Sequence, residues 1–199
     1  YTTVKLDMEI YNIAMSLERA YSPEPKEQQG AILFVKVRNY PYRLGLDGDP
    51  NKLVSEGVGN CTRKHLYLLP RLKGLGYKVD VGVAVFDWRQ LPIPNEILSL
   101  LKDPIQSHLF LFVDNKPVDA TWPPHVPGFS SNDWNGVDAT PIGVPALKIV
   151  KLNLPIFQAR VLAGSTLDIL RKPLKNDKPT PFNDAFNCWL AGFESGKIS

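Results

Sequence analysis

The sequence is poor in cysteine and in long apolar runs. Its two cysteines among 199 residues, Cys61 and Cys188, exclude a disulfide-rich scaffold but leave a single bond between them open. No apolar run approaches the about 20 residues that a membrane-spanning helix needs. We therefore expect no membrane partner and a soluble protein, with the cytoplasm slightly favoured. A signal peptide removed before Tyr1 would leave no trace, so the compartment stays open.

The sequence also lacks a large excess of either positive or negative charge. The formal net charge is only +3, and the densest basic cluster, residues 171–178, is interrupted by Pro173 and Asp177. A nucleic-acid-binding protein usually carries a concentrated basic face, so we expect no nucleic-acid partner. The 44% of hydrophobic and 22% of charged residues are typical of a globular protein with a buried core. Nothing in the sequence indicates an oligomeric state.

Helices are predicted where apolar residues recur at helical spacing. One helix should follow Asn60, which can cap it, and should run through several leucines to Gly74 and Gly76. Pro70 lies inside this segment and predicts a kink or a 3₁₀ passage, because it removes one backbone hydrogen bond. Residues 28–37 suit either a strand or a buried helix. Further helices are expected at residues 6–20, 49–56, 94–101, 163–170 and 183–193.

Strands are predicted in the second half of the chain. Valines that alternate from Val79 to Val85 indicate a strand with one buried face. Residues 108–113 form a second apolar strand, residues 116–121 a returning strand, and residues 148–154 a possible fourth. Helices followed by a run of strands indicate an α+β fold. The long segment 121–147, rich in proline and glycine, is of the kind that is usually functional or disordered.

Cys61 is the first candidate for chemistry. It stands at the predicted start of the helix after Asn60, where the positive end of the helix dipole and the nearby amides favour the thiolate. Gly57 and Gly59 just upstream leave room for a substrate. A lone cysteine is more often a small buried hydrophobic residue, so position alone does not assign catalysis.

A histidine and an aspartate come together if the hairpin after residue 113 has the shortest turn. With a two-residue turn at residues 114–115, Asp119 faces Phe110 across the hairpin. His108 shares a face with Phe110, so Asp119 becomes its diagonal neighbour, within reach of an imidazole nitrogen. A four-residue turn would place Asp119 opposite Phe112 and weaken the pairing. The alternative for His108 is a surface histidine at a strand entry.

Other side chains compete for a role. His65 lies four residues after Cys61, on the same helix face, where it could be the base or half of a metal pair. Two ligands do not make a zinc site and no cluster supplies the others, so we expect no metal or cofactor and interpret His65 as a helix-surface or packing residue. His125, in the long loop, is interpreted as a solvated histidine. Cys188 has no catalytic partner pattern.

Three segments in order resemble transglutaminase-like domains. Residues 34–43, Phe-Val-Lys-Val-Arg-Asn-Tyr-Pro-Tyr-Arg, are similar to the segment before the nucleophile. Residues 59–66, Gly-Asn-Cys-Thr-Arg-Lys-His-Leu, resemble the start of the nucleophile helix, with a Leu-Gly-Tyr exit at 75–77. Residues 118–122, Val-Asp-Ala-Thr-Trp, resemble the family's Val-Asp-Pro-Thr-Trp element. The three pieces in this order turn the interpretation of Cys61 from packing to function.

The resemblance implies a papain-like α+β core in which the nucleophile helix packs on an antiparallel β-sheet. It makes Cys61 the nucleophile, His108 the base and later the acid, and Asp119 the residue that orients His108. Tyr42 and Trp122 are the candidate substrate-binding residues, and the oxyanion donor is the amide of Cys61 or the side chain of Tyr42. The implied domains are a transglutaminase-like catalytic core with N-terminal helices, 1–147, and a C-terminal strand and helices that complete or cap it, 148–199.

The activity implied by the resemblance is acyl chemistry at an amide bond of a peptide or protein, through a thioester intermediate. Water as the acceptor gives a cysteine peptidase or amidase, and an amine gives a cross-linking transglutaminase. We favour hydrolysis, because mammalian-type cross-linkers are larger multidomain chains. Two alternatives stay open. One is a non-catalytic transglutaminase-fold module that binds peptides or serves as a scaffold, and the other is an arylamine acetyltransferase-like enzyme that uses an acyl-coenzyme donor.

Overall fold

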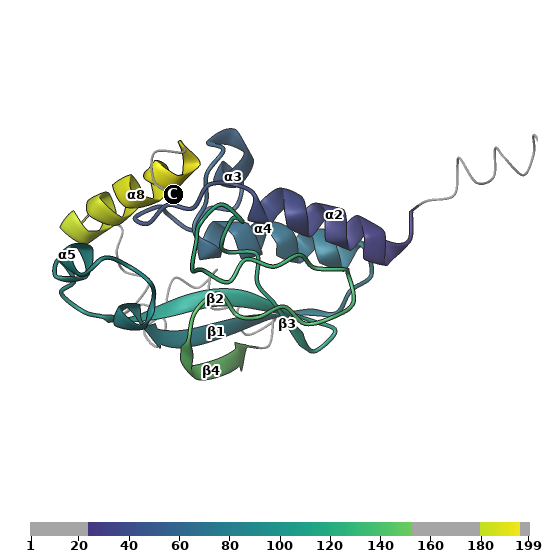
Figure 1. Cartoon of the computed structure of the whole chain (residues 1–199). Helices are drawn as coiled ribbons and strands as arrows, with labels where there is room; N and C mark the ends of the chain where they lie inside the picture. Colours follow the sequence, from purple (N-terminus) through teal and green to yellow (C-terminus); the bar gives the residue numbers. More distant parts are fainter. Residues whose placement is uncertain (1–23, 153–179, 196–199) are drawn as a thin grey trace, which may run out of the picture.

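The computed structural model describes residues 24–152 and 180–195. In these residues helices and strands form an α+β fold around a four-stranded antiparallel sheet with the strand order β3-β2-β1-β4 (Figure 1). The helices expected at 6–20 and 163–170 lie outside the described residues. Within the described ranges, no helix combines the length and the apolar character that crossing a membrane requires.

The sheet is built on two long strands, which pair antiparallel along their whole length. They are β1 (Val79–Asp87) and β2 (Ile105–Val113). A short β3 (Lys116–Val118) lies beside β2, and β4 (Ala146–Leu152) pairs with the other edge of β1. β1 is a strand, as the alternating valines predicted, and Val79, Val81 and Val83 are buried. The opposite face is largely buried as well, and Val85 is only half-buried, so β1 does not have a single buried face. β4 belongs to this sheet and spans residue 147, where the sequence analysis expects a domain boundary. That boundary stays a prediction.

The hairpin between β2 and β3 has the predicted two-residue turn. Asp114 and Asn115 have φ angles of 47° and 67°, the left-handed conformation that the tightest hairpin turns require at both central positions. The register pairs Val113 with Lys116, which confirms the predicted alignment of the two strands. β3 ends at Val118, earlier than expected, because the next backbone amides bind side chains instead of continuing the ladder.

Two helices cover one face of the sheet. α4 (Cys61–Gly74) packs against β2 and β1, and α2 (Lys26–Arg38) packs beside α4 (Figure 1). The ambiguous segment 28–37 is therefore helix. Tertiary packing, which buries Phe34 and Val37 completely, outweighs the strand preference of its β-branched residues. α4 stays α-helical across Pro70, without the predicted 3₁₀ passage. Buried leucines before and after the proline hold the helix against the sheet.

A third helix closes one end of the molecule. α8 (Pro181–Glu194) starts at Thr180, whose side chain accepts a hydrogen bond from the amide of Asn183. Its Phe186 packs on Trp88 of the short helix η1 (Trp88–Gln90), with ring centroids 5.4 Å apart. Asn187 exchanges two hydrogen bonds with the backbone of Leu44, at 2.8 and 3.1 Å. α8 therefore fixes the segment that leads into α4. Two one-turn helices, α3 (Lys52–Ser55) and α5 (Asn95–Leu98), complete the described elements.

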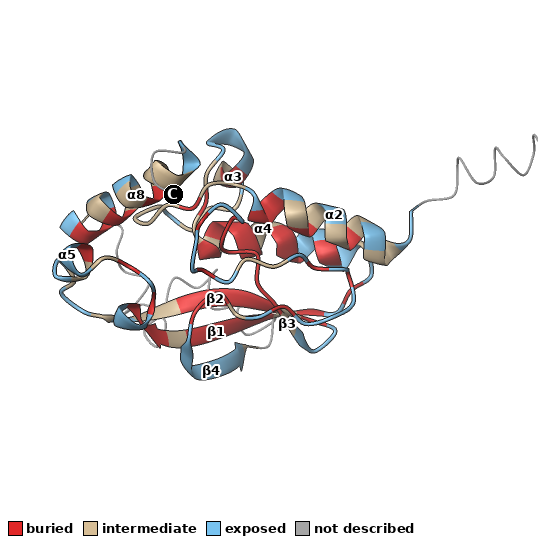
Figure 2. Cartoon of the chain, viewed as in Figure 1, coloured by how far each residue is buried: buried red, intermediate tan, exposed pale blue. Residues whose placement is uncertain are grey.

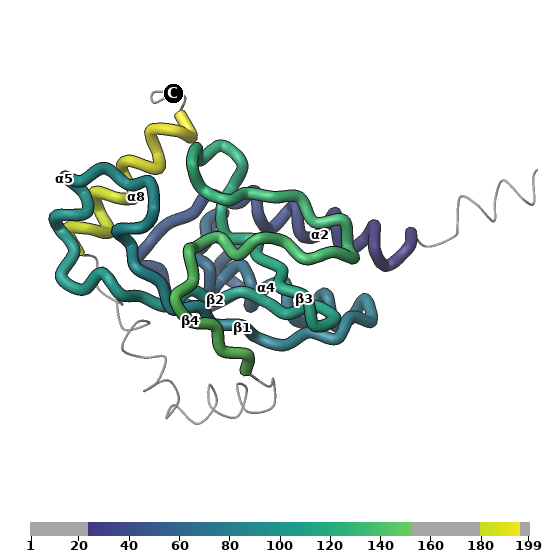
Figure 3. The backbone as a smooth tube through the Cα atoms, turned by 60° about the horizontal axis from the view of Figure 1, so that its bottom comes forward, coloured from purple at the N-terminus to yellow at the C-terminus, as the bar shows by residue number. Residues whose placement is uncertain are grey.

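The long connection from β3 to β4 is part of the packed structure. It runs out along α2 and returns to the sheet (Figure 3). Trp134 in this segment is buried against Phe34 and Tyr77, with ring centroids 5.9 and 5.4 Å away. Trp122 is buried nearer the sheet. Figure 2 shows the buried residues gathered on α4, β1 and β2, while β4 is largely exposed. The proline-rich loop thus holds buried aromatic side chains in place over the helices.

The glycine in the middle of β1 should be necessary for the β1–β2 pairing. A Cβ atom at Gly82 would lie 2.5–2.8 Å from the buried ring of Phe110. Gly82→Ala should therefore lower the free energy of unfolding by about 1–3 kcal/mol, as measured by urea denaturation. Gly74→Ala, where an added Cβ meets nothing within 4 Å, is the matched control and should be neutral or stabilising by up to about 1 kcal/mol. Equal losses in both variants would contradict the packing argument.

Candidate active site

Cys61 is the first residue of α4, as the sequence predicted. Asn60 caps the helix: its Oδ1 accepts a hydrogen bond from the amide of Arg63 at 2.8 Å, and its Nδ2 donates to the carbonyl of Leu46 at 2.9 Å. Arg63 is buried and its guanidinium also binds the backbone and carboxylate of Asp47, at 2.9 and 2.8 Å. Hydrogen bonds of Asn60 and Arg63 therefore hold the chain before and after Cys61 against the loop at residues 46–47, which fixes the backbone of the nucleophile candidate.

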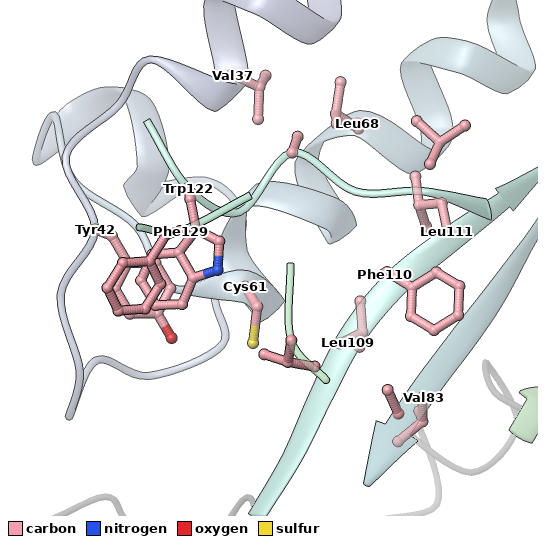
Figure 4. Packing of buried hydrophobic residues seen from close by; sticks show 14 of the residues in the cluster. Val37, Tyr42, Cys61, Leu68, Val83, Leu109, Phe110, Leu111, Trp122 and Phe129 are labelled. Atoms are coloured by element: carbon pink, nitrogen blue, oxygen red, sulfur yellow. The ribbon is translucent and has the colours of Figure 1, made fainter. Parts of the chain in front are cut away.

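His108 lies on β2, and its Nε2 contacts Asp119 Oδ2 at 2.5 Å. The imidazole is close enough to Cys61 for each group to shift the pKa of the other. Leu109, the next residue on β2, lies beside the thiol (Figure 4). The structure therefore brings together all three residues of the predicted triad, from α4, β2 and the segment after β3. His108 is buried, with 3% of its surface exposed.

The carboxylate of Asp119 is fully surrounded by donors. Besides His108, it accepts hydrogen bonds from the amide of Thr121 at 2.9 Å and from the amide of Gly143 at 2.8 Å. Its own amide donates to Thr140 Oγ1 at 2.8 Å. Burial raises the pKa of this carboxyl, but the charge and hydrogen bond of His108 lower it, so that the pKa lies well below its ordinary value. Asp119 is therefore an anion that holds the imidazole in one orientation.

The thiol and the imidazole stabilise each other's charged forms. Burial raises the pKa of Cys61, but the hydrogen bond and the charge of His108 and the amide of Leu109 lower it, and the net shift is downward. Burial lowers the pKa of His108, but Asp119 and Cys61 raise it, to about 10. Both shifts favour a thiolate–imidazolium pair, the form in which a cysteine is nucleophilic.

Aromatic side chains form a wall beside the thiol. Tyr42 packs on Trp122, and Trp122 packs on Phe129, with ring centroids 4.4 and 4.3 Å apart. Figure 4 shows the three rings next to Cys61, with Leu109 on the other side. Burial, followed by the nearby charges of Cys61 and Asp119, raises the pKa of Tyr42 well above its ordinary value. Tyr42 therefore remains protonated and acts as a donor.

Of the two predicted substrate-binding residues, only Tyr42 directs a polar atom at the thiol. Trp122 is buried, and its indole N–H donates to the carbonyl of Gly143 at 2.6 Å. Its contribution is to support the ring of Tyr42 from behind. The segment of Tyr42 is held against the start of α4 by two backbone hydrogen bonds, from Gly59 to Pro41 at 3.0 Å and from Arg43 to Gly59 at 3.1 Å.

His65 cannot be the base, because both of its nitrogens are engaged elsewhere. The amide of Ala120 donates to His65 Nε2 at 2.9 Å, so Nδ1 carries the proton and donates to the carbonyl of Cys61 at 2.7 Å. His65 is completely buried, and burial lowers its pKa to about 4. Of the two interpretations made from the sequence, the packing residue therefore describes His65 better than the helix-surface residue. His65 links the backbone of the nucleophile candidate to the residue after Asp119.

Lys64 is a site residue that sequence reasoning missed. Its ammonium donates to the carbonyl of Arg38 at 2.9 Å and to the carbonyl of Thr121 at 2.7 Å, and its side chain is fully buried. Burial lowers its pKa to about 7. Lys64 thereby ties the end of α2 and the segment after Asp119 to α4. The only sequence feature that could have indicated this role is the position of Lys64 within one helical turn of Cys61. That feature is weak, because lysines are ordinarily exposed.

The remaining candidates lie apart from the triad. His125 is exposed and sits 3.7 Å from Glu194 of α8. Cys61 and Cys188 are both free thiols, buried and exposed respectively, so no disulfide blocks the nucleophile candidate. Among the described residues, no group of three or more His, Cys, Asp or Glu side chains is placed to hold a metal ion.

Comparison of the chain with protein-family models, with curated proteins and with solved structures finds no match. The resemblance to transglutaminase-like domains is therefore carried only by the segments quoted above and by the positions of their residues. The geometry of Cys61, His108 and Asp119 provides the basis for a functional proposal.

Removing the His65 imidazole should destabilise the fold around the triad. His65→Ala would leave the buried amide of Ala120 without an acceptor, so the free energy of unfolding should fall by about 1–3 kcal/mol or more. Urea denaturation measures the change. His125→Ala, at the exposed loop histidine, is the control and should stay within about 0.5 kcal/mol of the wild type. A His65→Ala midpoint equal to that of the control would refute the buried hydrogen-bond role.

Proposed function

We propose that this chain is a cysteine-nucleophile hydrolase with a papain-like core, which cleaves an amide bond of a peptide or protein through a thioester intermediate. The observation that carries the proposal is that buried Cys61, at the start of α4, lies beside His108, whose Nε2 hydrogen bonds to the carboxylate of Asp119. A nucleophile, a base and a group that orients the base are the three parts of a catalytic triad, whichever fold presents them.

In the first step, the sulfur of Cys61 attacks the carbonyl carbon of the substrate, and the carbonyl oxygen becomes an oxyanion. The imidazolium of His108 then gives its proton to the leaving nitrogen, the carbon–nitrogen bond breaks and an amine departs. The product is a thioester on Cys61 and a neutral His108. Asp119 keeps the ring oriented throughout and stabilises its charged form.

In the second step, His108 takes a proton from a water molecule, and the resulting hydroxide equivalent attacks the thioester carbonyl. The carbon–sulfur bond breaks, the carboxylic acid leaves, and the thiolate–imidazolium pair is restored. An amine could attack in place of water, with the same residues. We favour water as the acceptor, because a water molecule needs less space than a second substrate beside Cys61, which is only 8% exposed.

Two donors are available for the oxyanion. The first amides of a helix have no intrahelical acceptor, and that of Cys61 lies at the first position of α4. The second donor is the hydroxyl of Tyr42, which is held by Trp122 and remains protonated. Donors fixed in advance around the reacting carbonyl stabilise the charge that develops in the transition state.

A non-catalytic module that binds peptides or serves as a scaffold is the second candidate function. The observation that favours it is the burial of Cys61 beside the ring of Tyr42, because both restrict access to the sulfur. The two functions differ in the reactivity of Cys61, which can be measured without knowing the substrate.

The rate of Cys61 alkylation by iodoacetamide should separate the two functions. Because the pKa of Cys61 is lowered, thiolate should be present below the pH of about 8.5 at which an ordinary thiol ionises, and labelling should stay fast towards pH 6. His108→Ala removes the positive charge, so its labelling should shift to higher pH. Mass spectrometry measures both profiles in a Cys188→Ala background, which removes the exposed thiol.

Two results would contradict the proposal. One is slow labelling of Cys61 that follows an ordinary thiol and is the same with and without His108. The other is a Cys61→Ala variant that retains full turnover of every amide substrate that the wild type hydrolyses. The first result would leave the binding module as the better explanation.

Replacing Tyr42 tests its role as an oxyanion donor. Tyr42→Phe keeps the ring packed on Trp122 but removes the hydroxyl, so kcat should fall by about 100-fold. Cys61 should remain alkylatable, because His108 still stabilises the thiolate. Tyr40→Phe, two residues earlier, is the matched control and should turn over normally. An unchanged kcat in Tyr42→Phe would exclude this role and leave the amide of Cys61 as the donor candidate.

A further inference from the structure

A pocket of about 300 Å³ lies between the end of η1 and the long loop that connects β3 with β4. None of its ten lining residues carries a charge. Six lining side chains are apolar, those of Leu91, Pro92, Phe129, Ile142, Val144 and Pro145, and the rest of the wall is formed by the polar side chains of Gln90 and Ser130 and by two glycines. The volume is at the lower end of the range for ligand sites, about 300–1,000 Å³, so it suits a single side chain with its backbone rather than a large ligand.

Two residues of the pocket wall contact the candidate active site. Gly143 in its wall donates its amide to Asp119 Oδ2 at 2.8 Å and accepts the indole N–H of Trp122 at 2.6 Å. Phe129, also in the wall, packs on Trp122 and lies beside Cys61 in Figure 4. The same residues that orient the triad therefore form one side of the pocket.

The pocket wall is closely fitted to the aromatic side chains behind it. A Cβ atom at Gly143 would lie 2.7 Å from the ring of Trp122, and one at Gly128, whose φ is 79°, would lie 2.9 Å from Pro92. Both positions therefore require glycine, and the loop cannot shift without disturbing its neighbours. A pocket held this closely is formed before any substrate arrives.

We propose that this pocket binds an uncharged, apolar side chain of the substrate, of the size of leucine or valine, next to the carbonyl that Cys61 attacks. The inference rests on the proposed function and names its substrate class. A charged side chain in this pocket would leave its hydration shell without finding an opposite charge among the lining residues. An apolar side chain gains from leaving water, and the differences that such pockets produce are about 10- to 100-fold in rate.

Active-site labels with different side chains test the inference without requiring turnover. In acyl-X chloromethyl ketones, where X is the residue beside the reacting ketone, Cys61 attacks the methylene carbon, a carbon–sulfur bond forms and chloride leaves. With X as leucine or valine, labelling of Cys61 should be about 10- to 100-fold faster than with X as arginine or glutamate. Mass spectrometry gives the rates, and iodoacetamide, which has no X, gives the intrinsic reactivity of the thiol.

A charge placed in the pocket should change this preference in a predictable direction. Ile142 is half-buried in the wall, so Ile142→Glu should slow the leucine label and speed the arginine label. Ile142→Lys should slow the leucine label and speed the glutamate label instead. Val137→Glu, at a residue that is 52% exposed and outside the pocket lining, is the control and should keep the wild-type preference. Urea denaturation shows whether each variant is folded.

The outcomes distinguish this inference from the proposed function. Fast iodoacetamide labelling with equal rates for all X would overturn the pocket assignment while the reactive cysteine stands. A preference for arginine or glutamate in the wild type would also overturn it. Failure of Cys61 to react with iodoacetamide and with every ketone would overturn the proposed function, and the pocket assignment with it. If both Ile142 variants are unfolded, the wild-type rates still decide.

Discussion

The hydrogen bond between His108 and Asp119 is the contact around which the described structure is organised. It joins β2 to the residue that follows β3, and it is possible only because the hairpin turns in two residues. A buried carboxylate is costly unless donors surround it, and here they come from three separate places: the histidine on β2, the amide of Thr121 and the amide of Gly143. One anion thereby fixes the orientation of the imidazole, the path of the chain after β3 and the return of the long loop.

α4 connects this anion to the nucleophile candidate. Its first residue is Cys61, and the two buried side chains of the same turn, Lys64 and His65, bind the backbone of Thr121 and Ala120, the two residues that follow Asp119. His65 also binds the carbonyl of Cys61 itself. The backbone of Cys61 and the segment after Asp119 therefore belong to one hydrogen-bonded unit, although Cys61 and Asp119 are 58 residues apart in the sequence (119 − 61). A unit of this kind keeps catalytic groups in place before a substrate binds, which electrostatic catalysis requires.

Burial strengthens the interactions of the site and also restricts access to it. The thiol lies beside the ring of Tyr42 and beside β2, so charges there act in a medium of low polarity, where the pKa of Cys61 falls and the pKa of His108 rises. The pocket proposed to bind a substrate side chain adjoins Asp119 through the amide of Gly143. In the proposed function, the exclusion of water and charge from this site would account both for the reactivity of Cys61 and for the selectivity for an uncharged side chain.

The sequence by itself determined the features that depend on neighbours along the chain. The cap at Asn60, the strand β1, the tight turn at Asp114–Asn115 and the strand register follow from local hydrogen bonding and from the period of the side chains, and the register already placed Asp119 beside His108. Only the tertiary structure decided that residues 28–37 are helix, that α4 continues through Pro70, and that Lys64 and His65 are buried links. It also decided the contact of Cys61 with His108 and the pocket at Gly143, because these depend on packing between segments far apart in sequence. Local patterns specify which elements form, whereas burial and the partners of buried polar groups exist only once those elements have been brought together.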